Sequence, residues 1–247
     1  MSRHQLPPLT LSAWLRYDAL MQIWPPGVFR VLEVGCGQGA LGARLAARYD
    51  YLGLEPDPGS AAVARARLRR VGRGQIRQAE DTTLDPADRF DVVCAFEVIE
   101  HLAEDRAAVQ RWIRHLHPGG TLLLSTPADP ARFGPADQAA GHFRRYSPAA
   151  LAALLTELGL EQVRVIRYGA PLGYALEAAR NAAARPAAAR SPSSLAERTA
   201  GSGRWHQPPA ALGVATQAGT LPFRLLQRRL PNRGVSLLAS ARRSSAN

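Results

Sequence analysis

The chain lacks lysine, holds only two cysteines and has no long apolar run. Cys36 and Cys94 cannot supply the disulfide framework of a small secreted domain, so we expect a reduced compartment. No apolar stretch approaches the roughly 20 residues that cross a bilayer. Residues 1–26 lack the basic start, apolar middle and cleavage site of a signal peptide. These absences predict a cytoplasmic protein.

Every Lys or Arg position is arginine, 31 in all against 20 acidic residues, which gives a net charge of +11. Residues 1–159 hold 18 arginines and 17 acids, whereas residues 160–247 hold 13 arginines and three acids. This C-terminal excess fits contact with phosphates or an anionic membrane face, and equally a composition set by codon bias. Hydrophobic residues make up 46% of the 247, enough for one sizeable core and too many for a disordered chain.

Short β-branched runs alternate with stretches of helical period, a pattern typical of a parallel sheet with crossover helices. The predicted strands are 29–34, 51–54, 75–78, 90–95 and 121–125, and the predicted helices between them are 40–48, 59–71 and 104–115. Because each strand is short and apolar, we expect helices on both faces of the sheet.

The second half has a different composition. Ser147 and Gly159 are a predicted N-cap and C-terminal stop for a helix over 147–158. Further predicted elements are a strand at 161–168, a helix at 171–184, a mobile insertion rich in Pro, Ser, Gly and Arg at 185–209, a helix at 221–230 and a last strand at 234–241.

The strongest motif is a buried strand that opens into a glycine loop. It reads Val31-Leu32-Glu33-Val34-Gly35-Cys36-Gly37-Gln38-Gly39 and leads into a helix. Glycines there allow positive φ and close approach of a ligand to the main chain, and the helix N-terminus offers free N–H groups. Gly35, Gly37 and Ala40 also fit the dinucleotide pattern G-x-G-x-x-G/A, so the loop alone leaves the cofactor open.

An acidic residue, Glu55, follows the second predicted strand, where its carboxylate can accept both hydroxyls of a ribose. That feature suits NAD and S-adenosylmethionine alike. The discriminating segments are Glu80-Asp81, the run from Cys94 to Leu102 (CAFEVIEHL), and His117-Pro118-Gly119-Gly120.

Together these segments resemble the class I S-adenosylmethionine-dependent methyltransferases, in particular the ubiquinone and menaquinone biosynthesis-like subgroup, from about residue 28 to 165. The resemblance implies that the glycine loop wraps the methionine portion, Glu55 holds the ribose, Glu80 or Asp81 reaches the adenine edge, and Phe96 with Glu97 lies beneath the sulfonium. The implied cofactor-binding set is Glu33, Gly35, Cys36, Gly37, Gly39, Glu55, Pro56, Glu80, Asp81, Phe96 and Glu97. For Glu80 and Asp81 a solvated loop is an equal alternative.

The resemblance also implies an α/β fold: a Rossmann-like, seven-stranded, mostly parallel sheet with helices on both faces and an antiparallel last strand. We expect a single methyltransferase domain over 1–247. It divides into an N-terminal helical lid at 1–27, a cofactor-binding core at 28–168, a basic, partly mobile substrate-side insertion at 169–233 and a last strand at 234–243.

Two histidines are candidates for chemistry. Spacing of i, i+3 and i+4 predicts that Glu97, Glu100 and His101 share one helical face, and His142 falls in a loop expected near the active site. His101 or His142 could act as a general base. With Glu97 and Glu100 they could also bind a divalent metal, although helix ordering without a metal is the favoured interpretation.

Two helices carry open alternatives. Trp14 and Tyr17 either lid the cofactor or pack in the core. In segment 221–230, three leucines occupy one face and arginines the remainder, so the helix could lie on an anionic membrane or, as we favour, pack on its own domain with an arginine face in solvent.

The sequence therefore predicts methyl transfer from S-adenosylmethionine to a small-molecule or lipid-linked acceptor, with oxygen the preferred atom. The protein would be cytoplasmic, with peripheral contact at the inner membrane face as an option, and its oligomeric state stays open. One alternative is an RNA methyltransferase, disfavoured because no aromatic stacking platform or Asn-Pro-Pro-Tyr-type run is present. The other is a NAD-dependent oxidoreductase or a non-catalytic nucleotide-binding module.

Overall fold

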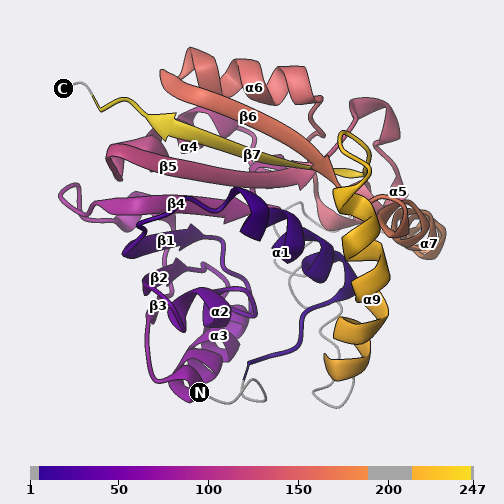
Figure 1. Ribbon diagram of the computed structural model, residues 1–247, viewed down its shortest axis with the longest axis horizontal. Coiled ribbons are helices and arrows are strands. Elements are labelled where there is room, and N and C mark those ends of the chain that lie inside the picture. The colour runs from indigo at the N-terminus through magenta and orange to yellow at the C-terminus, as the bar shows by residue number, and fades with distance from the viewer. Residues whose placement is uncertain (1–5, 189–212, 246–247) are drawn as a thin grey trace.

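A seven-stranded sheet forms the centre of the computed structural model, which describes residues 6–188 and 213–245 (Figure 1). Its order is β3-β2-β1-β4-β5-β7-β6, and β7 runs antiparallel to both of its neighbours while the remaining pairs are parallel. The predicted fold class is confirmed. The strands are β1 Arg30–Val34, β2 Asp50–Leu54, β3 Gln75–Arg77, β4 Phe90–Phe96, β5 Leu116–Pro127, β6 Leu160–Tyr168 and β7 Ser236–Arg243.

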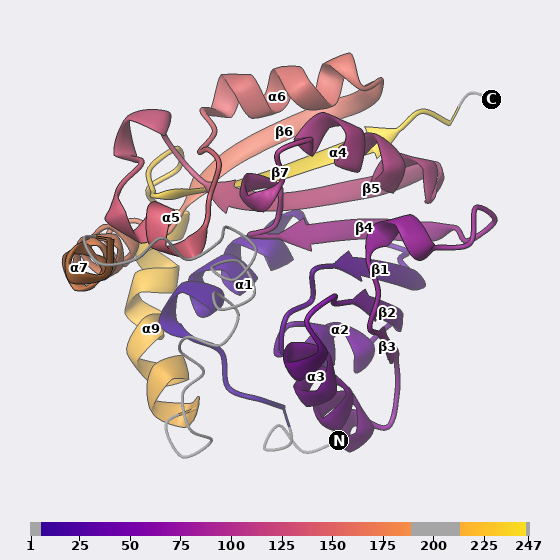
Figure 2. The same cartoon turned by 180° about the vertical axis from the view of Figure 1, so that it is seen from behind.

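Helices cover both faces of the sheet, as the two opposite views show (Figures 1 and 2). Two clusters of apolar side chains are buried beneath them. Trp112 of α4 and Leu151 of α6 pack on one face, and Leu20 of α1, Leu45 of α2 and Leu68 of α3 pack on the other. The helices are α1 Leu11–Ile23, α2 Gly42–Ala46, α3 Pro58–Val71, α4 Asp105–Arg114, α5 Pro135–Ala140, α6 Pro148–Glu157, α7 Leu172–Ala188 and α9 Gly213–Arg228.

Local capping explains where several helices begin and end. The Ser147 hydroxyl accepts a hydrogen bond from the Ala150 N–H at 3.1 Å, so the predicted N-cap of α6 is confirmed. Asp57 caps α3 in the same way, and Gly72 ends that helix with a left-handed φ of 75°. The Ser147 hydroxyl lies three residues from the amide that it caps, which is why the sequence alone located this boundary.

The basic insertion is more helical than the sequence predicts. Helix α7 continues through Ala188, so residues 185–188 belong to a helix rather than to a mobile segment; residues 189–209 lie outside the described part of the chain. Helix α9 begins at Gly213, eight residues before the predicted start. In the described residues no helix is both long and apolar enough to cross a bilayer.

Helices α1, α5, α7 and α9 gather at the end of the sheet toward which β4 and β5 point (Figures 1 and 2). Helix α9 docks on α1 through Gln227, whose amide donates to the Leu15 carbonyl at 3.1 Å and accepts from the Gly169 N–H at 3.1 Å. The predicted leucine face does not make this contact, because Leu221 and Leu225 are 49% and 51% exposed. Gln227 and the partly buried Phe223 therefore hold α9 against the domain, and part of its exposed face is apolar.

Candidate active site

The glycine loop, residues 35–39, connects β1 to α2 at the carboxyl end of the sheet. Gly35, Gly37 and Gly39 all have positive φ, between 53° and 72°, a region that other residues enter at a cost. A methyl group on Gly35 would lie 2.6 Å from Val98, whereas one on Gly37 would meet no protein atom within 4 Å. The space beside Gly37 is thus open at the point where the motif predicts a ligand.

Glu55 lies next to this loop at the end of β2. Its two carboxylate oxygens accept the N–H groups of Gly37 at 2.8 Å and Asp57 at 2.9 Å. Burial raises the Glu55 pKa, and these two backbone hydrogen bonds act against that effect. Each oxygen retains a further lone pair for a ligand hydroxyl. Pro56 is exposed and has no N–H that could compete for the carboxylate.

Two members of the predicted set lie deeper. Glu33 is buried on β1 and accepts the Tyr51 hydroxyl at 2.6 Å, and burial raises its pKa to about 7. The Cys36 thiol is also buried, and burial raises its pKa well above the usual range, so it is unreactive as a thiolate. Both residues support the loop from its buried side.

The predicted adenine-edge acids differ from each other. Asp81 accepts the Trp112 indole N–H at 2.8 Å and the Arg111 Nε–H at 3.0 Å, which ties the turn after β3 to helix α4. Glu80 is exposed. Asp81 therefore has a structural role already, and Glu80 is the acid with a side chain in solvent.

The prediction that Glu97, Glu100 and His101 share a helical face is wrong. The Glu97 N–H bonds to the Ser125 carbonyl of β5 at 2.9 Å, so the ladder continues to this residue and the chain must then turn sharply. Glu97 takes a left-handed φ of 57°, and a short 3₁₀ turn at Ile99–His101 follows. The Glu97 carboxylate consequently points to the Ser125 hydroxyl at 2.7 Å and to Arg16 at 3.4 Å.

Arg16 of α1 is a site residue that sequence reasoning missed. Its guanidinium lies 5.8 Å from the centre of the buried Phe96 ring, and it lines a cavity of about 30 Å³ with Glu97 and Tyr168. One arginine among 31 carries no distinguishing signal in the sequence. Its neighbours Trp14 and Tyr17 pack in a small apolar cluster with Ala40, directly after the glycine loop, which supports the core interpretation; the lid over the cofactor stays a prediction.

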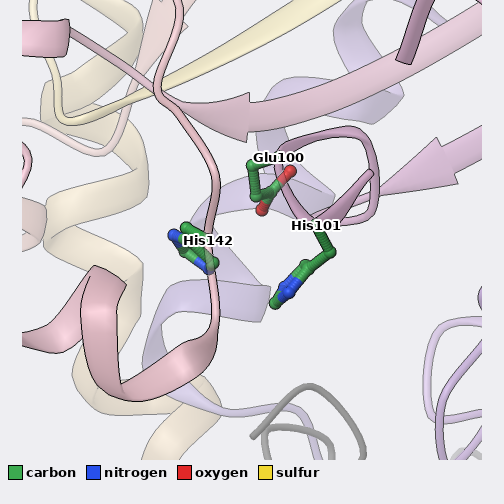
Figure 3. A group of neighbouring side chains, drawn as sticks. All are labelled: Glu100, His101 and His142. Carbon is green, nitrogen blue, oxygen red and sulfur yellow. The ribbon is translucent and has the colours of Figure 1, made fainter. Parts of the chain in front are cut away.

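Glu100, His101 and His142 form a compact group, the histidine cluster (Figure 3). Glu100 and His101 come from the turn after β4 and His142 from the loop after α5; the two imidazole rings are perpendicular with centres 4.5 Å apart. Glu100 is fully buried, and within residues 6–188 and 213–245 neither of its carboxylate oxygens has a hydrogen-bond partner; nor has His101 Nδ1. The sequence placed His101 and His142 in the site, and the structure brings them together.

The electrostatics of the cluster favour neutral groups. Burial, and then the neighbouring His142, lowers the His101 pKa to about 4. Burial, and then Glu97, raises the Glu100 pKa well above its usual range. Such a group can exchange protons or bind a divalent cation, because one atom of each side chain lies within 4.8 Å of the others. Glu97 is not part of it. The preference for a metal-free site stays a prediction.

Charged residues surround His142, and no local sequence motif predicts them. Asp137 of α5 lies 2.8 Å from His142 Nδ1 and accepts two hydrogen bonds from Arg145, at 2.9 and 2.7 Å. Arg145 also binds Glu177 of α7, and Arg132 donates to the same carboxylate. The partners of this network come from separate elements, so only the folded chain brings them together.

Comparison with known proteins identifies the class of domain. Residues 32–122 match the family model described as a methyltransferase domain. The YcgJ protein of Bacillus subtilis, 17% identical, aligns over 93% of this chain and 98% of its own with a TM-score of 0.60, which supports the fold alone.

Curated relatives define the class more narrowly. A ubiquinone biosynthesis O-methyltransferase of Azorhizobium caulinodans is 38% identical over 100 residues, 39% of this chain and 40% of the relative. A probable S-adenosylmethionine-dependent methyltransferase of Mycolicibacterium smegmatis is 39% identical over 138 residues, 53% of this chain and 51% of the relative. The resemblance to class I methyltransferases of the ubiquinone-like subgroup is confirmed. The chain spans about half the length of these relatives.

Proposed function

We propose that this protein is an S-adenosylmethionine-dependent methyltransferase that methylates a hydroxyl oxygen of a small molecule. The observation that carries the proposal is the open space beside Gly37, bordered by the Glu55 carboxylate that accepts the Gly37 N–H at 2.8 Å. A nucleoside ribose fits that combination of exposed backbone and carboxylate. The names of the curated relatives favour S-adenosylmethionine over NAD as the nucleoside.

Each remaining cofactor contact is proposed from the family resemblance and its position. Gly35, Gly37 and Gly39 would wrap the methionine portion over Glu33 and Cys36, and Glu55 with Pro56 would hold the ribose. Glu80 would reach the adenine edge from its exposed position, with Asp81 fixing the turn. Phe96 and Glu97 would lie beneath the sulfonium, where Arg16 adds a guanidinium suited to the methionine carboxylate.

The reaction is an in-line displacement. The acceptor oxygen forms a bond to the methyl carbon while the sulfur–carbon bond breaks and its electron pair stays on sulfur. Because the sulfonium is intrinsically reactive, alignment of donor and acceptor is the main task, and it is worth about 7–11 kcal/mol in good geometry. His101 or His142 would take the hydroxyl proton, a contribution of roughly 10² to 10⁴ in rate.

We also propose that the chain folds as one domain in the cytoplasm, with α9 able to meet an anionic membrane when the acceptor is lipid-linked. Leu221, Leu225 and Leu226 are 42–51% exposed on this helix, beside Arg228 and Arg229. Apolar side chains flanked by arginines are typical of helices that lie on anionic lipid surfaces.

The decisive experiment is calorimetric binding of S-adenosylhomocysteine to the wild type and to Gly37→Ala, with Gly27→Ala as the matched control. Both glycines have positive φ, 53° and 70°, and neither would place a methyl group within 4 Å of a protein atom. Their effects on stability should therefore match, at about 1 kcal/mol. Only Gly37→Ala should abolish binding, because only there does the methyl group enter the cofactor space.

Glu55→Ala should abolish binding as well, and excess NAD should leave the wild-type titration unchanged. Absence of wild-type binding, or displacement by NAD, would overturn the proposal in favour of a NAD-dependent enzyme or a nucleotide-binding module. Equal binding by Gly37→Ala and Gly27→Ala would show that the cofactor lies elsewhere.

A further inference from the structure

We infer that His142, rather than His101, is the base of the proposed reaction, and that Asp137 is the positioning residue that sets its tautomer and orientation. The reaction itself is taken from the proposed function, on which this inference rests. The choice of His142 over His101 comes from the geometry around His142.

The contact between Asp137 and His142 fixes which ring nitrogen is free. Asp137 Oδ1 lies 2.8 Å from His142 Nδ1, and the His142 N–H also bonds to the Asp137 carbonyl at 2.9 Å. An ionised carboxylate only accepts hydrogen bonds, so Nδ1 must carry the proton. The lone pair of a neutral His142 then lies on Nε2, as in other carboxylate-oriented histidine bases.

Asp137 is held in the ionised state that this role requires. It is 2% exposed, and burial opposes its ionisation. Hydrogen bonds from His142, from Arg145 and from the Gly134 N–H outweigh burial and hold the Asp137 pKa well below its usual range. The carboxylate is therefore charged, buried and fixed from three directions.

His101 lacks these features. Among the described residues its Nδ1 is buried without a partner, and the nearby Glu100 carboxylate makes no hydrogen bond to its ring. The titratable groups that face His142 are Asp137 from α5, and Glu100 and His101 from the turn after β4. Of the two histidines, only His142 has a ring hydrogen bond to a carboxylate in the described part of the chain.

The proton step balances without a further reactant. The acceptor O–H proton moves to His142 Nε2 as the oxygen attacks the methyl group, and S-adenosylhomocysteine leaves with the electron pair of the broken S–C bond. The resulting imidazolium is stabilised by Asp137 and then returns its proton to solvent. Arg145 also binds Glu177, so the orientation of the base depends on α7 at the other end of the network.

The first arm of the test needs no acceptor. Nitrogen-15 NMR of histidine-labelled wild-type protein at neutral pH should show His142 with its proton on Nδ1, assigned by loss of the signal in His142→Gln. Asp137→Asn should give a mixture of tautomers, while His117→Gln, the same change at an exposed histidine, should leave the His142 signal unchanged. An Nε2–H tautomer in the wild type would overturn the inference even if Asp137→Asn fails to fold.

The second arm measures kcat and KM for the phenol that is methylated fastest in a screen. His142→Gln should lower kcat by roughly 10² to 10⁴ with KM nearly unchanged. Asp137→Asn should lower kcat by at least about tenfold, and the double variant should be no slower than His142→Gln alone, because Asp137 acts through His142. If the kcat losses of the two single variants multiply in the double variant, the assignment is overturned. A larger loss of kcat in His101→Gln than in His142→Gln would also overturn it.

Binding of S-adenosylhomocysteine separates the two hypotheses. It should stay within twofold of wild type in His142→Gln, Asp137→Asn and the double variant. A wild type that binds no S-adenosylhomocysteine contradicts the proposed function, whereas normal binding with the wrong tautomer contradicts this inference alone.

Discussion

One carboxylate from the neighbouring strand holds the glycine loop, whereas a network of several buried charged side chains holds His142 of the histidine cluster. Gly37 is fixed by Glu55, 18 residues away, next to a parallel strand pair whose register is regular. His142 depends on Asp137, Arg145 and Glu177, with 32 residues between the last two. The first region thus depends on one contact between adjacent strands, and the second on a set of buried charges that must all be paired.

The largest expected effect comes from breaking the charged network. Arg145→Ala would leave Asp137 and Glu177, 2% and 5% exposed, as buried carboxylates without this partner. We expect the free energy of unfolding to fall by about 3–5 kcal/mol, measured by urea denaturation. The matched control is Arg106→Ala. Its partner is Glu157, both side chains are more than half exposed, and the loss should stay below about 1 kcal/mol. Similar losses of unfolding free energy in Arg145→Ala and Arg106→Ala would contradict the expected difference between the buried network and an exposed ion pair.

A second test concerns the buried carboxyl beneath the glycine loop. Burial raises the Glu33 pKa from 4.5 to about 7, so the folded state holds a proton that the unfolded state releases between these values. Stability is therefore fully present below pH 4.5 and declines as pH rises through 7, by about 3 kcal/mol in total. Glu33→Gln should remove this decline when urea unfolding is compared at pH 5 and pH 8.

The control for that experiment is Glu161→Gln, the same change at an exposed position, which should leave the pH dependence as it is in the wild type. A Glu33→Gln protein that loses as much stability as wild type between pH 5 and pH 8 would contradict the assigned pKa.

The smallest expected effect is that of metal removal on the histidine cluster. If the cluster works without a metal, dialysis against EDTA should change the melting temperature by less than about 1 °C, and added Mg²⁺ or Zn²⁺ should not raise it. A rise of several degrees that disappears in His142→Gln would instead identify a cation site at Glu100, His101 and His142, whose donor atoms lie within 4.8 Å of one another.

The parts of the fold that depend on neighbouring residues could be predicted from the sequence. The Ser147 N-cap, the apolar strand before Gly35 and the position of Glu55 all follow from signals a few residues long. The turn at Glu97 could not be predicted, because the hydrogen bond to Ser125 that extends β4 is a contact between strands. The residues from Glu97 to His101 have helical spacing, but pairing between β4 and β5 determines their conformation instead.

The candidate site was predictable to a similar extent. His101 and His142 were identified from spacing and from family resemblance, and they do lie together. Arg16 and Asp137 were missed because an arginine in a lysine-free chain and an aspartate in an Ala-rich segment have no local signal. Arg16 reaches Glu97 only because α1 packs at the end of β4, and Asp137 lies five residues from His142 in a loop whose path sequence periodicity does not encode.

The position of β7 has a consequence for the order in which the chain acquires its shape during synthesis. Among the described strands β6 pairs only with β7, which separates it from β5, so β6 lacks this neighbour until residues 236–243 have left the ribosome. Strands β1 to β5 can assemble well before that moment. The glycine loop and Glu55 would then be in place while β6 still awaits β7, so synthesis completes the two halves of the sheet at different times.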